Sequence, residues 1–245
     1  IVRGEMPDLG CRTGDFFFLE QPDAFAQQRL VVDLVSRRLP KSYGYDPLRD
    51  IQVITPAKQG PLGTRELNRL LQGKLNPPER GKGEATLMGR TLREGDKVMQ
   101  IRNNYDIIWQ QPDGTAGTGI FNGDMGIIEM LDPGSKTIQV RFEEKLATYS
   151  FENQDQLEHA YAVTVHKSQG SEYPAVILPL LGGPRMLFNR NLLYTGITRA
   201  RNCVTILGSS ETVRNMIENV SENRRYTGLE QRIREICCLP ENDTP

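Results

Sequence analysis

The sequence predicts an α/β protein built on a parallel sheet, with a small antiparallel β-barrel inserted into it. Three observations predict this fold. Apolar strand-like runs are followed by Gly-rich loops and then by helical patterns, which is typical of a parallel sheet covered by helices. The same kind of strand returns near the end of the chain. Between them, over residues 83–156, short β-like runs alternate with turn signals.

The composition is that of an ordinary globular protein, with 38% hydrophobic and 25% charged residues in a chain of 245. No apolar run has membrane-spanning length and no secretory signal is found, so we expect a cytoplasmic protein without a membrane partner. The net charge of −1 argues against a strong non-specific grip on duplex DNA, although it permits a local basic channel. Because the chain starts at Ile1, we expect a fragment of a longer protein.

The first part of the α/β layer, residues 1–82, begins with a short apolar run. Phe16–Leu19 suits a strand that is covered on both faces. Pro22 and Asp23 predict the start of a helix, and we expect Pro40 to end it. The apolar positions of this helix recur at helical spacing; they are Phe25, Val31, Val32, Val35 and Leu39.

A second strand and helix complete this part. Ile51–Ile54 is the strand, and a loop rich in Gly and Pro follows it. Thr64 suits the N-cap of the next helix, and Asn76 followed by two prolines ends it. The stripe expected to be buried consists of Leu67, Leu70, Leu71 and Leu75.

The insert, residues 83–156, has the short β-like runs and frequent turn signals of an all-β unit. Its turn signals include Asn103-Asn104, Asn122-Gly123 and Asp132-Pro133. Such closely spaced runs predict a small antiparallel barrel. The β-like runs are Lys97–Ile101, Ile107–Trp109, Gly126–Leu131, Thr137–Phe142 and Thr148–Phe151.

The last part, residues 157–245, resumes the α/β layer. Ala160–Val165 and Ala175–Leu181 read as buried strands, and the polar string HKSQG lies between them. An imidazole, an ammonium, a hydroxyl and an amide together do not suit a hydrophobic core, but they suit the binding of a phosphate or of a ligand's backbone. We expect a third strand at Cys203–Gly208 and then helices over 209–220 and 224–238.

Two strings in this part resemble motifs V and VI of superfamily-1 DNA helicases, most closely those of the RecD-like family. They are TVHKSQGSEY, from Thr164 to Tyr173, and LLYTGITRAR, from Leu192 to Arg201. The stretch from Asp50 to Thr64 is similar to motif IVa of the same family. The resemblance implies a RecA-like second motor domain of the P-loop NTPase type, and it implies that the insert is a Src-homology-3-like barrel.

The resemblance also implies a nucleotide site, with Arg199 as a catalytic finger on the γ-phosphate of ATP. A guanidinium fork held in one place suits the charge that develops on a transferring phosphoryl group. Glu172 would accept a hydrogen bond from the ribose, and Gln169 and Gly170 would form the turn beside it. ATP with Mg²⁺ would be bound mainly by a partner domain. The simpler alternatives are a surface salt bridge for Arg199 and a solvated loop acid for Glu172.

The same resemblance implies contacts with single-stranded DNA. The first set comes from motif V and would bind successive phosphates without reading bases. The second set surrounds the start of the helix after Ile51–Ile54, where backbone N–H groups would bind phosphate. The alternatives are an ordinary strand–helix turn and a structural histidine. The first set is Thr164, His166, Lys167 and Ser168, and the second is Thr55, Pro56, Gly60, Gly63 and Thr64.

No G-x-x-x-x-G-K-[ST] string occurs, because Gly73-Lys74 is followed by Leu75 and Gly81-Lys82 by Gly83. We therefore expect the chain to be inactive alone and to serve as the C-terminal motor portion of an ATP-dependent 5′-to-3′ DNA helicase. Its partners would be single-stranded DNA, an N-terminal RecA-like domain of the same parent protein and other subunits of a repair complex. The alternative is a non-enzymatic module that binds single strands or a protein. A nuclease lacks support, because the carboxylates are not clustered.

Overall fold

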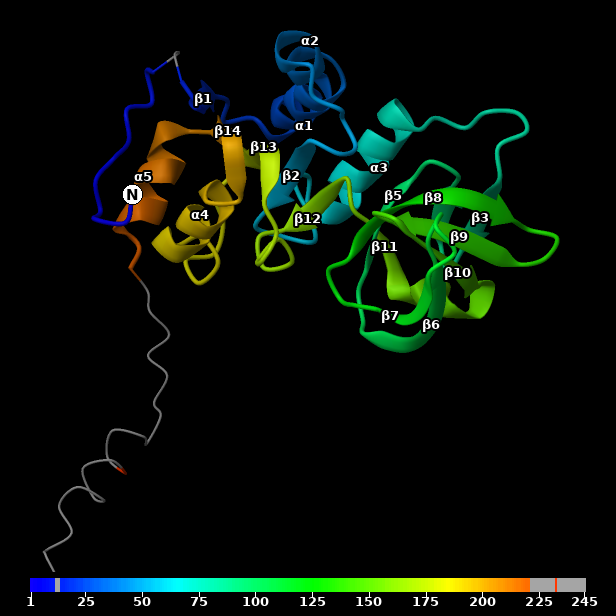
Figure 1. The fold of residues 1–245 in the computed structure, drawn as a ribbon. Coiled ribbons are helices and arrows are strands. Elements are labelled where there is room, and N and C mark those ends of the chain that lie inside the picture. Colours follow the sequence, from blue (N-terminus) through cyan, green and yellow to red (C-terminus); the bar gives the residue numbers. More distant parts are fainter. Residues whose placement is uncertain (12–13, 221–231, 233–245) are drawn as a thin grey trace, which may run out of the picture.

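The computed structural model describes residues 1–11, 14–220 and 232, which form two main sheets side by side (Figure 1). The first sheet has five strands, all parallel, in the spatial order β1-β14-β13-β2-β12. This confirms the expected parallel layer. Its strands are β1 (Phe16–Glu20), β2 (Ile51–Thr55), β12 (Ala162–Thr164), β13 (Tyr173–Pro179) and β14 (Ala200–Gly208).

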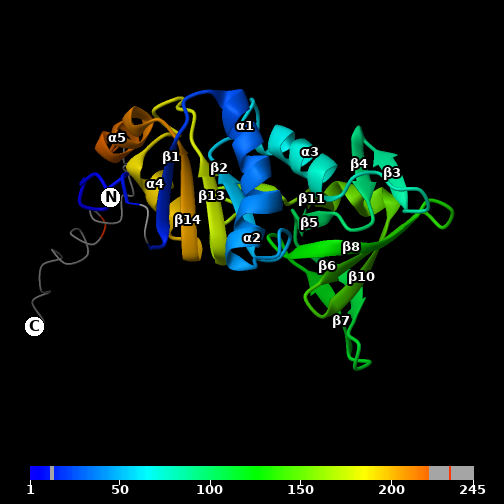
Figure 2. The same ribbon diagram turned by 90° about the horizontal axis from the view of Figure 1, so that it is seen from above.

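Helices cover both faces of this sheet (Figure 2). On one face, α1 (Ala24–Asp33) and α3 (Thr64–Leu75) bury Val31, Leu67 and Leu71 against the strands. On the other face, α4 (Arg190–Ile197) and α5 (Ser210–Glu218) do the same with their own apolar stripes. Strands β2 and β13 are buried along almost their whole length, because both of their faces lie inside.

The first helical region departs from the expectation at two places. The helix does not end at Pro40, because it continues through a π-helical turn, η1 (Leu34–Arg38), into α2 (Leu39–Tyr43). The Leu39 N–H donates to the Leu34 carbonyl, so the hydrogen-bond ladder is already widened ahead of the proline, whose missing N–H is then tolerated in the first turn of α2. Phe25, expected among the apolar positions of this helix, is 63% exposed and lies in the first turn of α1.

The second sheet has seven antiparallel strands in the order β11-β5-β8-β9-β10-β6-β7, which confirms the antiparallel insert. Alternate residues of β9 are buried, as a half-covered strand requires. A separate hairpin, β3 (Glu84–Leu87) and β4 (Arg90–Arg93), precedes this sheet. The seven strands are β5 (Lys97–Gln100), β6 (Asn104–Gln110), β7 (Ala116–Ile120), β8 (Met125–Asp132), β9 (Thr137–Phe142), β10 (Lys145–Ser150) and β11 (Leu157–His159).

Strand β11 continues the seven-stranded sheet past residue 156 and leads directly into β12 of the parallel sheet. Only Ala160 and Tyr161 separate the two strands, and both are buried. A 3-10 turn, η2 (Phe151–Gln156), comes just before β11. The two sheets are therefore joined by a very short connection on this side.

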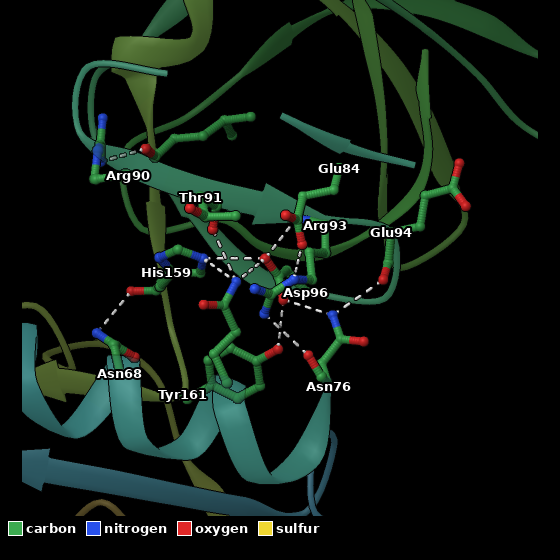
Figure 3. Close-up of polar contacts among 12 residues, drawn as sticks. Asn68, Asn76, Glu84, Arg90, Thr91, Arg93, Glu94, Asp96, His159 and Tyr161 are labelled. Carbon is green, nitrogen blue, oxygen red and sulfur yellow. Dashed lines mark hydrogen bonds and ion pairs between the residues drawn. The ribbon is translucent and has the colours of Figure 1, made fainter. Parts of the chain in front are cut away.

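A buried carboxylate reinforces this joint (Figure 3). Asp96, just before β5, is completely buried and accepts hydrogen bonds from α3, from β11 and from the residues around them. Burial tends to raise the pKa of Asp96, but the contacts with His159 and Asn76 outweigh it and hold the pKa below its ordinary value. The partners are Gln72 Nε2 at 2.7 Å, Asn76 Nδ2 at 2.6 Å, Tyr161 OH at 2.9 Å, His159 Nε2 at 3.0 Å and the Arg93 N–H at 2.8 Å.

The last described helix, α5, confirms the helix expected over residues 209–220. The second helix expected there, over residues 224–238, lies outside the described residues. Among the helices that the structure describes, none is both long and apolar enough to span a membrane.

Candidate functional site

The two segments expected to contact a single strand leave neighbouring strand ends. Strands β2 and β12 are paired in parallel with Thr55 opposite Thr164, and the Val165 N–H donates to the Thr55 carbonyl at 3.2 Å. The loops that follow, residues 56–63 and 165–172, therefore begin side by side at the carboxyl edge of the sheet. The tertiary structure thus brings together two motifs that lie about a hundred residues apart in the sequence.

The loop after β2 uses its own polar groups to close on itself. The Thr55 hydroxyl is buried and donates to the Leu62 carbonyl at 2.6 Å. The backbone N–H groups of Thr64 and Arg65 donate to the carbonyls of Ala57 and Lys58 at 3.0 and 3.3 Å. Two of the N–H groups at this helix start are therefore already satisfied within the loop.

The helix start also differs in its cap. The N-cap of α3 is Gly63, not Thr64, and no side chain caps the helix. Gly63 is buried, and a Cβ there would lie only 2.5 Å from the Gln59 carbonyl oxygen. Pro56 is buried as well, whereas Gly60 is exposed at the loop tip with φ +90°. Of this set, Gly60 and the half-buried Thr64 reach the surface.

The loop after β12 is held in the same way by its hydroxyl groups. The Ser168 hydroxyl is buried and donates to the Val165 carbonyl at 2.8 Å. Thr164 is also buried, and its hydroxyl accepts from the Lys167 N–H at 3.3 Å. These two residues shape the turn, and His166 and part of Lys167 face the solvent. The Lys167 ammonium donates to Glu158 Oε2 of β11 at 2.8 Å.

Arg199 lies at the opposite edge of the sheet, where β13 and β14 begin with Tyr173 beside Ala200. Its half-buried guanidinium donates to the carbonyls of Thr195 and Ser171 at 3.2 and 3.1 Å, and to the Thr198 hydroxyl at 3.3 Å. All three acceptors are neutral. Among the described residues, no carboxylate lies within ion-pair distance of Arg199, so its charge is available to an anion.

The turn before β13 holds the other expected nucleotide contacts. Gln169 and Gly170 are exposed, and Gly170 has φ +86°, a conformation that glycine adopts without strain. Glu172 is exposed and pairs with Arg201 at 3.0 Å. The turn also provides the Ser171 carbonyl that orients Arg199. Gln169, Gly170 and Glu172 therefore belong to the same turn that orients Arg199, and the loop 165–172 connects this turn to the carboxyl edge.

Sequence patterns do not identify Glu158 as the partner of Lys167 or Asp96 as the centre of the joint. Neither residue lies in a motif, and their partners belong to other elements. The one usable signal is a charged or polar residue inside an otherwise apolar strand run, as at Asp96-Lys97 before Val98.

Two family models match the chain. The first, described as the ATP-dependent RecD-like DNA helicase SH3 domain, covers residues 67–142. The second, described as the UvrD-like helicase C-terminal domain, covers residues 159–207. The first match confirms the Src-homology-3-like insert, and the second covers both strings that resemble motifs V and VI.

Relatives with curated names extend the likeness over most of the chain. The ATP-dependent RecD2 DNA helicase of Deinococcus radiodurans is 33% identical over 234 residues, which are 96% of this chain and 29% of the relative. The RecBCD enzyme subunit RecD of Mycolicibacterium smegmatis is 28% identical over 187 residues, 76% of this chain and 30% of the relative. The chain thus spans about three tenths of the length of these relatives.

Among solved structures, the Pif1 helicase from Bacteroides in complex with ADP-AlF3 and ssDNA aligns over 87% of this chain and 50% of that chain. The alignment has 18% sequence identity and a TM-score of 0.46. The assignment depends on the family models and the curated relatives, which agree over both sheets. This chain belongs to the RecD-like helicases and combines the family's SH3 domain with a UvrD-like C-terminal helicase domain.

Proposed function

We propose that this chain is the C-terminal motor portion of an ATP-dependent DNA helicase that moves 5′ to 3′ along single-stranded DNA and unwinds duplex. ATP with Mg²⁺ would be held mainly by an N-terminal RecA-like domain of the parent protein. The observation that carries the proposal is the environment of Arg199, whose guanidinium is oriented by three neutral acceptors and has no carboxylate partner among the described residues.

This environment suits phosphoryl transfer. Arginine is permanently charged, and its planar fork matches two phosphate oxygens at once. Because the acceptors around Arg199 are neutral, an incoming γ-phosphate would not have to displace a carboxylate. The fork would stabilise the charge that develops during transfer, and Glu172 would leave Arg201 to accept from the ribose. The bound nucleotide would supply the phosphoryl chemistry with its Mg²⁺ ion.

Strand binding would take place at the other edge of the sheet. His166, Lys167 and Gly60 lie at the tips of the two neighbouring loops, where successive phosphates could be contacted without reading the bases. The loop 165–172 links the two edges. A movement that closes the nucleotide edge around ATP would therefore also move the residues that contact the DNA strand. The 5′-to-3′ direction is inferred from the family.

The test is Arg199→Ala in the full-length protein. Arginine fingers contribute about 10³-fold or more to turnover, so DNA-stimulated ATP hydrolysis should fall by about that factor. The dissociation constant for single-stranded DNA should stay within about twofold, because Arg199 lies at the edge away from the strand loops. Arg214→Ala is the matched control, since Arg214 is exposed on α5.

Wild-type turnover in Arg199→Ala would remove this residue from the mechanism. If the wild-type full-length protein binds single strands but hydrolyses no ATP, the chain is a binding module and not part of a motor. The absence of a phosphate-loop string from the printed sequence is the observation that makes this second candidate worth testing.

A further inference from the structure

A side chain of the barrel sheet reaches into the loop that follows β12. Glu158, on β11, accepts a hydrogen bond from the Lys167 ammonium, with Nζ and Oε2 2.8 Å apart. The Lys167 side chain is 25% exposed and that of Glu158 is 40% exposed, so both remain accessible to a ligand. An exposed ion pair of this kind contributes about 1 kcal/mol at most to the stability of the fold. Stability therefore does not explain why this pair is present.

Two more cations come from segments next to this pair. Lys58 is exposed on the loop after β2, and its charge acts on Glu158. Arg90 comes from the β3–β4 hairpin, and its Nη1 donates to the Leu157 carbonyl at 2.9 Å, next to Glu158 in the chain (Figure 3). Partial burial tends to raise the pKa of Glu158, but the hydrogen bond from Lys167 and the three positive charges outweigh it and lower the pKa.

The cluster thus consists of one carboxylate, a cation paired with it and two further cations, and each cation comes from a different segment. Lys58 and Lys167 belong to the two loops that begin side by side at the carboxyl edge of the parallel sheet. Arg90 adds a contribution from the hairpin next to the barrel sheet. An excess of positive charge at such a meeting point is an electrostatic footprint for a polyanion, even in a chain whose net charge is −1.

We propose that Lys58, Arg90 and Lys167 form one phosphate-binding site for single-stranded DNA, and that Glu158 holds Lys167 in place until a phosphate of the strand replaces the carboxylate. This inference rests on the proposed function and deepens it. It brings the β3–β4 hairpin into the path of the strand. It also makes Glu158 a positioning residue, which orders a flexible ammonium before DNA arrives.

The test measures binding of a fluorescein-labelled oligothymidylate to the full-length protein by anisotropy, over salt concentrations from about 50 to 200 mM, where such affinities are strongly salt-dependent. Lys58→Gln and Arg90→Gln should each weaken binding about fivefold near 100 mM salt. Each should also reduce the slope of log affinity against log salt by about 0.7, the value for one phosphate contact on a single strand. Glu158→Gln should tighten binding about threefold at the lowest salt, because it removes the competing anion.

Arg214→Gln is the control, because it removes an exposed cation on α5 and should change neither slope nor affinity. The thermal unfolding temperature of every variant should match that of the wild type, which separates binding from folding.

Unchanged slopes for both Lys58→Gln and Arg90→Gln would overturn the site. Weaker binding by Glu158→Gln would overturn the role of Glu158 as a stand-in for phosphate. In either case a wild-type protein that binds the strand with a steep salt dependence would leave the proposed function standing. A wild-type protein that binds no single strand would instead remove the proposed function itself.

Discussion

Lys97 is a lysine enclosed by protein at the joint between the two sheets. Its side chain is 5% exposed, and its ammonium donates to Gln52 Oε1 at 2.9 Å. Burial lowers the pKa of Lys97 to about 8, and the charges of Asp46 and Asp50 offset only part of that effect. The folded protein therefore holds this proton less tightly than the unfolded chain does.

The consequence is a rise in stability at alkaline pH. Below about pH 8 the folded and the unfolded protein both carry the Lys97 proton, so this group does not make the free energy of unfolding depend on pH. Between about pH 8 and the ordinary value of 10.5, the unfolded chain binds more of this proton than the folded protein does. The free energy of unfolding should rise across this window by up to about 3 kcal/mol from this group. Urea unfolding at several pH values would measure it in this 245-residue chain.

Lys97→Met is the comparison, because other groups that titrate in this window are present in both proteins. The difference between the two stability curves should change with pH only between about pH 8 and 10.5. If the free energies of unfolding of the two proteins changed with pH in parallel, the lowered pKa of Lys97 would be contradicted.

At the scale of one element, α3 shows how two glycines that lie ten residues apart can have opposite roles. Gly63 caps the helix with φ −74°, so its backbone conformation is open to any residue. The requirement there is space, because a Cβ would lie 2.5 Å from the Gln59 carbonyl oxygen. Gly73 lies inside the same helix, and a Cβ there would meet nothing within 4 Å.

Alanine at these two positions should therefore shift stability in opposite directions. Gly63→Ala should destabilise the chain by about 1–3 kcal/mol, because the loop backbone must move. Gly73→Ala should stabilise it by about 0.5–1 kcal/mol, because alanine loses less backbone entropy in a helix. Urea denaturation midpoints of the two variants measure both effects. Equal shifts of the same sign would show that the close approach at Gln59 does not constrain the loop.

At the scale of the whole molecule, the buried Asp96 joins the parallel sheet to the barrel sheet. Its partners come from α3, from β11 and from the segment before β12, so several elements depend on one carboxylate (Figure 3). Removing one member of such a network leaves the other polar groups buried and unpaired.

Asp96→Ala should therefore cost about 3–5 kcal/mol, the range found when a buried charge partner is removed. We also expect calorimetric unfolding to separate into two transitions, one for each sheet. Asp106→Ala removes an exposed carboxylate of β6 and should stay within about 0.5 kcal/mol of the wild type. A single cooperative transition in Asp96→Ala would show that the apolar contacts alone join the two sheets.

The dependence of the free energy of unfolding on pH below about pH 4 tests the same carboxylate. Because the folded-state pKa of Asp96 is lowered, its contribution is present above the ordinary value of 3.8 and is lost as pH falls through the folded value. The wild type should thus lose stability below about pH 4 more steeply than Asp96→Ala.

The sequence by itself determined the elements and the family. Apolar runs place β2, β13 and β14, and turn signals mark most of the barrel strands, because side-chain period and turn chemistry act over a few residues. The strings around His166 and Arg199 carried the resemblance to RecD-like helicases, which the family models confirm. The sequence does not predict strands β3, β4, β7 and β11, because each is a short run with few large apolar residues.

Only the tertiary structure decided what each polar group does. Thr55 and Ser168 belong to the motifs, yet their hydroxyls are buried and close the loops, while Glu158 belongs to no motif and holds Lys167. Asp96 meets His159 from 63 residues away. A hydrogen bond depends on distance and burial in the folded chain, and packing between remote elements sets both. Residue type and local spacing therefore do not determine it.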